Sequence, residues 1–171
     1  MSITSLQMKG ATFWRTIDKA GWGPGEWQSE PDKAQWYDPR TGMACLIVRN
    51  HYGALCGYAA VEADHPLHGQ DYGVPDVDVH GGLTFSGPCS NSVDHSTGIC
   101  HIPGAGRTDD VWWFGFDCVH WRDFRPGYRS YLLDIGLNMN EAGACAPVPP
   151  HVTYRNFNLS LIHISEPTRP Y

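Results

Sequence analysis

The chain has 171 residues, with 18 acidic against 12 basic side chains and a net charge of −6. This balance disfavours nonspecific binding to nucleic acid, which requires a basic surface that neutralises phosphates, although Arg122, Arg125 and Arg129 form a local basic patch. No apolar run approaches the roughly 20 residues of a membrane span, and residues 1–10 lack the apolar core of a signal peptide. We therefore expect no membrane partner.

The first forty residues are rich in Trp, Gly and Pro and show little periodicity. Residues 13–17 predict a short edge strand, and residues 21–27 are irregular because glycine and proline disfavour regular structure. Residues 29–36 predict one or two helical turns, since Ser29 suits an N-cap and Pro31 suits a first turn. We expect four tryptophans here to cover the sheet as a lid: Trp14, Trp22, Trp27 and Trp36.

The clearest secondary-structure signal is a β-hairpin. Two apolar runs, 43–49 and 54–61, are separated by a short turn, 50–53, that contains Asn and Gly. Such a pair predicts two adjacent antiparallel strands. His51 then lies at the tip of the turn, where we expect it to be solvated.

Two further stretches, 76–86 and 111–120, predict neighbouring antiparallel strands. Apolar and polar residues alternate along the first, which gives it one apolar and one polar face. Gly81 and Gly82 interrupt the pattern and indicate a bulge or the close approach of another group. The second stretch starts almost wholly apolar, as a buried strand does, and then turns polar.

Two polar loops contain further histidines. Residues 62–73 include His65 and His68, whose spacing would suit a metal but which are more often solvated. Residues 87–110 form a long loop, and loops of this length tend to be functional or mobile. It contains Cys89, His95, Cys100 and His101, whose spacing matches no common zinc pattern, although His101 alone could reach the polar cluster described below.

The order of elements predicts an α+β fold with a mainly antiparallel sheet, few short helices and long irregular loops. One of these helices is expected at 130–138. We expect a single domain over residues 1–158. All six cysteines are expected to be free, because no export signal is present and Cys45, Cys56 and Cys118 lie in apolar runs that would bury them.

Residues 159–171 resemble the translation of a transposon-type sequencing adapter. We therefore expect this segment to be a non-native tail that contributes little to the fold. The resemblance implies that the gene came from assembled metagenomic reads and that the native C-terminus is missing.

The candidate chemistry lies where the two neighbouring strands end. The predicted ligands of a divalent metal, zinc or manganese, combine imidazole and carboxylate: His80, Asp117, His120 and Asp123. Such an ion would lower the pKa of a bound water and polarise a phosphoryl or carbonyl oxygen. Predicted catalytic partners are a general base, Asp78 or Glu62 (Asp76 is an alternative), and Thr84 as a hydrogen-bond donor.

The same residues also have an ordinary structural interpretation. Asp117 could cap a turn, His120 could bond a backbone carbonyl, and Asp123 could pair with Arg122 or Arg125. The sequence contains no HExxH, nucleophile elbow, phosphate-binding glycine loop or zinc-deaminase motif that would decide the question.

Five segments together resemble an uncharacterised family found in bacteriophages and prophages: 45–48, 56–58, 80–85, 99–101 and 112–120. The resemblance extends from about residue 22 to residue 157 and implies a protein made in the cytoplasm of a bacterial host. The family carries no established activity, so it supplies no catalytic residues.

These observations lead to two hypotheses of different classes. The first is a small metal-dependent hydrolase that acts on a nucleotide-like or phosphoester substrate. The alternative is a non-enzymatic phage accessory protein that binds a host protein or a small ligand. A bound metal would favour the first, and an exposed aromatic patch without metal would favour the second.

Overall fold

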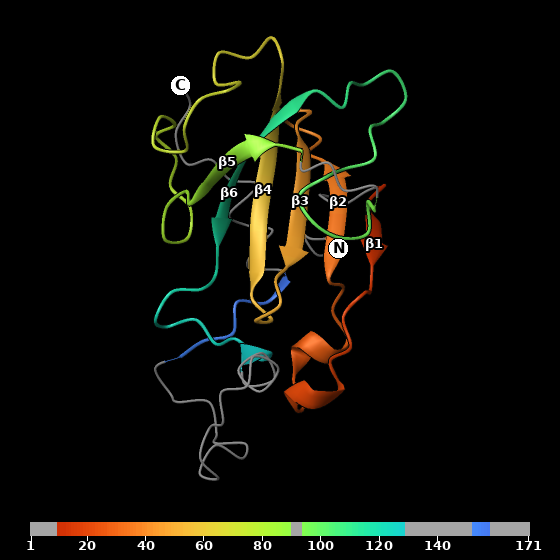
Figure 1. The fold of residues 1–171 in the computed structure, drawn as a ribbon, viewed down its shortest axis with the longest axis vertical. Helices are drawn as coiled ribbons and strands as arrows, with labels where there is room; N and C mark the ends of the chain where they lie inside the picture. The colour runs from red at the N-terminus through yellow and green to blue at the C-terminus, as the bar shows by residue number, and fades with distance from the viewer. Residues whose placement is uncertain (1–9, 90–93, 129–151, 158–171) are drawn as a thin grey trace.

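The computed structural model describes residues 10–89, 94–128 and 152–157. They contain one six-stranded antiparallel sheet with the order β1-β2-β3-β4-β6-β5 (Figure 1). The strands are β1 (Thr12–Trp14), β2 (Lys33–Tyr37), β3 (Ala44–Arg49), β4 (Leu55–Glu62), β5 (Phe85–Pro88) and β6 (Val111–Asp117). The prediction of a mainly antiparallel sheet is thus confirmed.

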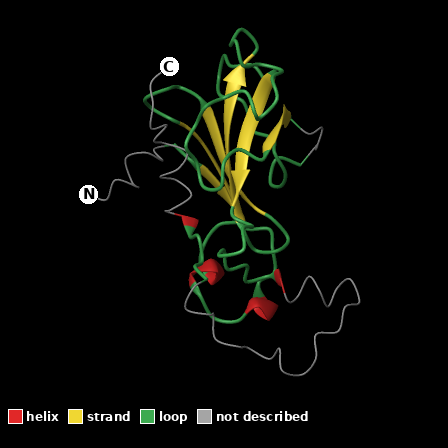
Figure 2. Cartoon of the chain, turned by 90° about the vertical axis from the view of Figure 1, so that its left-hand side faces the viewer, coloured by secondary structure: helices red, strands yellow, loops and turns green. Residues whose placement is uncertain are grey.

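Helical structure is sparse in these ranges. Two single 3-10 turns precede β2, η1 (Ala20–Trp22) and η2 (Glu26–Gln28), and lie beyond one end of the sheet (Figure 2). The fold described is therefore sheet-rich, and its helical content does not establish the α+β class. The helix predicted at 130–138 and the tail at 159–171 lie outside the described residues. Within the described part of the chain, no helix has both the length and the apolar character needed to cross a bilayer.

The predicted hairpin is confirmed as β3 and β4, which pair from Cys45 opposite Ala59 to Arg49 opposite Leu55. Its turn is closed by the Asn50 side chain, whose Oδ1 accepts hydrogen bonds from the backbone N–H groups of Tyr52 and Ala54. His51 is exposed at the tip, as expected. Asn in such a turn satisfies backbone donors that the short loop would otherwise leave unpaired.

The strand predicted over 76–86 is wrong in extent, because the strand found there, β5, begins only at Phe85. Gly81 and Gly82 both have positive φ, 70° and 82°, and the Gly82 N–H donates to the Val79 carbonyl. Two consecutive left-handed residues make a turn, which ends any ladder at this point. The predicted neighbour relation is nevertheless confirmed, since β5 pairs antiparallel with β6.

The helical turns predicted over 29–36 are also wrong, because β2 occupies 33–37 between β1 and β3. Pairing on both edges outweighs the local preference of Ser29 and Pro31 for a helix start. The edge strand expected near 13–17 is present as β1 over 12–14.

Both faces of the sheet are buried. The core of one face includes Trp36, Cys45, Ile47, Leu55 and Phe157. The core of the other includes Ala44, Leu46, Ala60, Val111 and Trp113, with Ile99 of the long loop packed against it. Trp36 therefore belongs to the sheet core, whereas the buried Trp27 packs against Phe124 and Tyr154.

The long loop is fastened to the sheet by a buried lysine. Lys33 Nζ donates to the carbonyl oxygens of His95 at 2.8 Å, Thr97 at 3.1 Å and Cys100 at 2.7 Å. Gln35 forms two hydrogen bonds with the backbone of Ile102. These contacts satisfy polar side chains that β2 would otherwise bury unpaired.

A disulfide between Cys89 and Cys100 closes the same loop. The prediction that all cysteines are free is therefore wrong for this pair, because the fold brings two residues of one loop together at a Cα–Cα distance of 4.9 Å. Cys45, Cys56 and Cys118 are free and buried, as predicted. Cys145 lies outside the described residues.

A buried ionic network ties the hairpin to both ends of the described chain. The Arg49 guanidinium contacts the Asp32 carboxylate at 3.1 Å and the Glu30 carboxylate at 2.9 Å. Lys19 Nζ lies 2.6 Å from the same Asp32, and the Tyr154 hydroxyl accepts a hydrogen bond from Arg49 and donates one to Glu30. No local pattern in the sequence predicts this network.

Candidate metal centre

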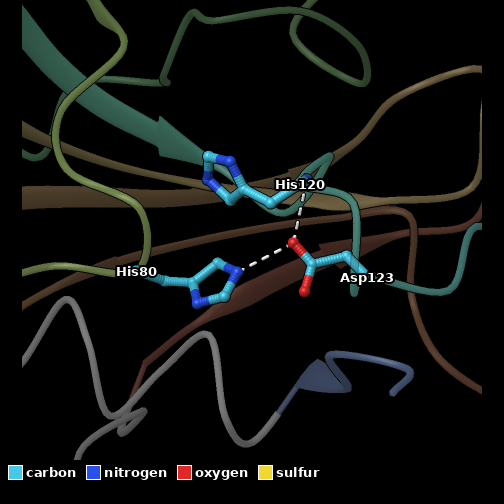
Figure 3. Close-up of side chains that lie close together, drawn as sticks. All are labelled: His80, His120 and Asp123. Carbon is cyan, nitrogen blue, oxygen red and sulfur yellow. Dashed lines mark hydrogen bonds and ion pairs between the residues drawn. The ribbon is translucent and has the colours of Figure 1, made fainter. Parts of the chain in front are cut away.

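The candidate centre forms at one end of the sheet because β5 and β6 are antiparallel. In such a pair, the segment that precedes one strand lies beside the segment that follows the other. His80 lies in the turn before β5, whereas His120 and Asp123 lie in the loop after β6. Figure 3 shows these three side chains gathered at this point.

Asp123 is the hub of the cluster. Its Oδ2 atom lies 2.8 Å from His80 Nε2 and accepts a hydrogen bond from the backbone N–H of His120 at 3.0 Å (Figure 3). Its Oδ1 atom accepts a hydrogen bond from Arg155 Nε, also at 3.0 Å. Burial alone would raise the pKa of Asp123, but the bonds to His80, Arg155 and the His120 N–H outweigh it and lower that pKa below 3.8. The carboxylate is therefore ionised at neutral pH.

The two imidazoles lie edge to face, with ring centroids 5.1 Å apart. His120 Nε2 is buried and has no hydrogen-bond partner among the described residues. It packs against Gly81, where an added Cβ would lie only 1.8 Å from Nε2. Gly81 is thus required both by its positive φ and by the close approach of the histidine.

The three side chains have the donor types of a transition-metal site. One potential ligand atom from each of His80, His120 and Asp123 lies within 4.8 Å of the others. Ligands that share one ion lie about 3–4 Å apart, so a small rotation of an imidazole is needed to bring them to bonding distance. Two imidazoles and one carboxylate suit zinc, manganese or iron. The buried Nε2 of His120, which has no hydrogen-bond partner among the described residues, also fits this interpretation.

Asp117, the fourth predicted ligand, has other partners. Its Oδ1 accepts a hydrogen bond from the Val119 N–H at 3.0 Å, and its Oδ2 accepts one from Thr84 Oγ1 at 2.9 Å. It therefore caps the turn after β6, as the structural alternative expected. Its Oδ1 also lies 4.0 Å from His120 Nε2, which makes it a neighbour of the cluster.

The predicted catalytic partners are dispersed. Asp78 is exposed and close in sequence to His80, and Thr84 is exposed and engaged with Asp117. Glu62 pairs with Val111, at the end of β6 opposite to Asp117, and contacts Arg107 at 3.2 Å. Because the six-residue rise between those ends is about 20 Å, Glu62 cannot act as a base at this cluster.

The other histidines considered from the sequence lie elsewhere. His101 is buried against Trp113 and Tyr37 and does not join the cluster. His68 Nε2 lies 3.6 Å from the Asp110 carboxylate. Together with His65 and Glu62, His101 lines a pocket of about 530 Å³ at the far end of the sheet.

Sequence reasoning missed the contribution of Arg155. The structural alternative offers Arg122 or Arg125 as a partner for Asp123, but the chain returns at 152–157 and Arg155 forms the ion pair instead. A parallel bridge between Asp123 and Thr153 holds the two segments together. No local pattern in the sequence signals this contact, because it joins segments that lie far apart in the chain.

Comparison with protein-family models, with curated proteins and with solved structures gives no match for this chain. The functional argument therefore rests on the geometry of the described residues.

Proposed function

We propose that His80, His120 and Asp123 bind a divalent transition metal, zinc or manganese, and that the protein is a metal-dependent hydrolase of nucleotide-like or phosphoester substrates. The observation that supports this most is the grouping of two imidazoles and an ionised carboxylate within 4.8 Å, from segments on either side of a strand pair. The buried, unpartnered Nε2 of His120 adds to it, because a metal would satisfy this atom.

The chain supplies a site with three protein ligands, which leaves a coordination position open for water or substrate. A bound divalent ion lowers the pKa of such a water and polarises a phosphoryl oxygen. Asp123 contributes negative charge and fixes the His80 ring, while Arg155 and the His120 N–H hold the carboxylate in place. Asp78 and its alternative Asp76 remain candidates for a base, since both are exposed and close to His80 in sequence.

The direct test is metal analysis of freshly purified, untagged protein, followed by zinc or manganese titration of chelator-treated protein. We expect one ion per chain, at least tenfold weaker binding in His80→Ala and His120→Ala, and hydrolysis of a model phosphodiester that depends on the ion. His51→Ala is the matched control, because His51 is exposed at the hairpin tip. Wild-type protein that binds no zinc or manganese would refute the proposal.

A second candidate is the non-enzymatic phage accessory protein, made in the cytoplasm of a bacterial host, that binds a host protein. It is favoured by exposed apolar side chains on the loop after β4, Tyr72 at 44% and Val74 at 55% of their full exposure. Loss of a host partner in a Tyr72→Ser variant, with no metal bound to wild-type protein, would support this candidate.

A further inference from the structure

The loop that follows β6 carries a second set of side chains that the metal centre does not use. We propose that Trp121, Arg122, Arg125 and Tyr128, here called the arginine–aromatic face, bind a nucleoside monophosphate beside the metal centre. This inference rests on the proposed function and specifies its substrate class.

Trp121 is the most exposed large apolar side chain in the described part of the chain, at 74%. The Arg122 guanidinium lies over its ring, 4.3 Å from the centroid. An exposed indole stacks well on a nucleobase, and a guanidinium binds phosphate oxygens through two parallel hydrogen bonds. The pair therefore offers both groups that a nucleotide requires.

A second arginine–aromatic pair stands on the same loop. The Arg125 guanidinium lies 4.2 Å from the centroid of the Tyr128 ring, and Tyr128 packs against Tyr52 of the hairpin turn. The Gly127 N–H donates to the Tyr52 carbonyl at 2.9 Å, and Gly53 lies so close to this loop that a Cβ would meet Gly127 N at 2.7 Å. The two loops hold each other in place, which reduces the cost of ordering the face when a ligand binds.

Charge points to a phosphate as the occupant. Within 10–89, 94–128 and 152–157, neither Arg122 nor Arg125 forms an ion pair with a carboxylate, whereas Arg49, Arg107 and Arg155 each do. Two guanidiniums that have no carboxylate partner among the described residues, on a chain of net charge −6, make a local site for an anion. Arg122 directly precedes Asp123 in the chain, and this adjacency in sequence is the reason for proposing that the phosphate binds beside the candidate metal ligands. The acidic chain as a whole favours a single nucleotide over a long nucleic acid.

The test is isothermal titration calorimetry, which measures the affinity of the purified chain for adenosine monophosphate and, separately, for inorganic phosphate. We expect Arg122→Gln with Arg125→Gln to weaken binding of both by about tenfold to 100-fold. Trp121→Ala should weaken the nucleotide by roughly 5- to 150-fold and leave inorganic phosphate unchanged. The matched control is Arg107→Gln, because Arg107 also stacks on an aromatic ring, Tyr37, but pairs with Glu62.

The titration is repeated on chelator-treated protein and on the His80→Ala variant. Nucleotide binding that needs Arg122 and Arg125 but not His80 supports the face even if no metal binds, and separates it from the proposed function. Wild-type protein that binds zinc but not the nucleotide would refute the proposal for the arginine–aromatic face and leave the proposed metal site standing. An equal loss in Arg107→Gln, or tighter binding of a single-stranded oligonucleotide than of the monophosphate, would also overturn the proposal for this face.

Discussion

Replacement of Arg49 by Met tests whether the buried ionic network stabilises the fold. The Arg49 side chain is fully buried and contacts two carboxylates, Asp32 and Glu30, whose side chains are 2% and 13% exposed. Methionine has similar length and no charge, so the variant leaves both carboxylates without this partner. Arg49 Nη1 also donates to the Gly53 carbonyl in the hairpin turn, and that bond is lost as well.

Removing one partner of a buried ion pair costs about 3–5 kcal/mol, because the other charge stays buried and uncompensated. Lys19 remains 2.6 Å from Asp32 and still compensates one of the two carboxylates. We therefore expect the lower part of that range, about 3 kcal/mol. For a chain of this size, such a loss lowers the melting temperature by about 6–12 °C.

Thermal and urea denaturation of wild type, Arg49→Met and Arg40→Met measure the effect. Arg40 is the matched control, because its side chain is 55% exposed and lies 3.9 Å from Asp38, a pair worth at most about 1 kcal/mol. If Arg49→Met and Arg40→Met lose equal stability, the reasoning about burial is incorrect.

Three further predictions concern the turn, the long loop and a buried imidazole. Gly81→Ala should cost more than the roughly 1–2 kcal/mol of left-handed backbone strain and should abolish metal binding, because its Cβ would displace the imidazole packed on it. Gly82→Ala, whose φ is also positive but whose Cβ would meet open space, should show only that strain in the same thermal denaturation and zinc titration. Reduction of Cys89–Cys100 should cost about 2–3 kcal/mol, and thiol counting on denatured protein should find two thiols fewer before reduction than after it; equal counts would contradict the disulfide. Burial lowers the pKa of His101 below 6.5 despite Asp109, so the unfolded chain takes up a proton that the folded chain does not, and stability should fall as the pH drops through 6.5. His101→Gln should reduce that decline in urea unfolding at pH 7.5 and 5.5, and an unchanged pH dependence would count against the assignment.

The strands that sequence reasoning found are those whose environment is local. The β3–β4 hairpin was predictable because two apolar runs flank a turn whose Asn50 and Gly53 have a defined role. The strand β2 was missed because Lys33 and Gln35 are polar residues at buried positions. Their hydrogen-bond partners are carbonyl groups in the loop 94–104, far along the chain. The residues near β2 in the sequence do not show that these two polar side chains will find hydrogen-bond partners when they are buried.

The disulfide was missed for a related reason. Cysteine spacing does not show whether a loop folds back on itself, so the sequence leaves the pairing of Cys89 with Cys100 undetermined. Disulfides persist mainly in oxidising compartments, so Cys89–Cys100 stands in tension with the expectation of a cytoplasmic protein. Cys45, Cys56 and Cys118 do not help to decide the compartment, because buried thiols remain unreactive in either one. Burial raises the pKa of Cys45 and of Cys56 to about 12.

The candidate site was partly predictable, but by a different route from the one assumed. The sequence pattern places His80 on the polar face of a strand. In the structure, His80 lies instead in the glycine turn that precedes β5, and this turn brings its Nε2 to Asp123. His80 Nε2 can exchange its proton for a metal, as imidazoles do. The difference between a structural hydrogen-bond network and a metal centre is therefore whether His80 Nε2 keeps its hydrogen bond to Asp123 or would bind an ion instead, and the fixed carboxylate prepares the site for either.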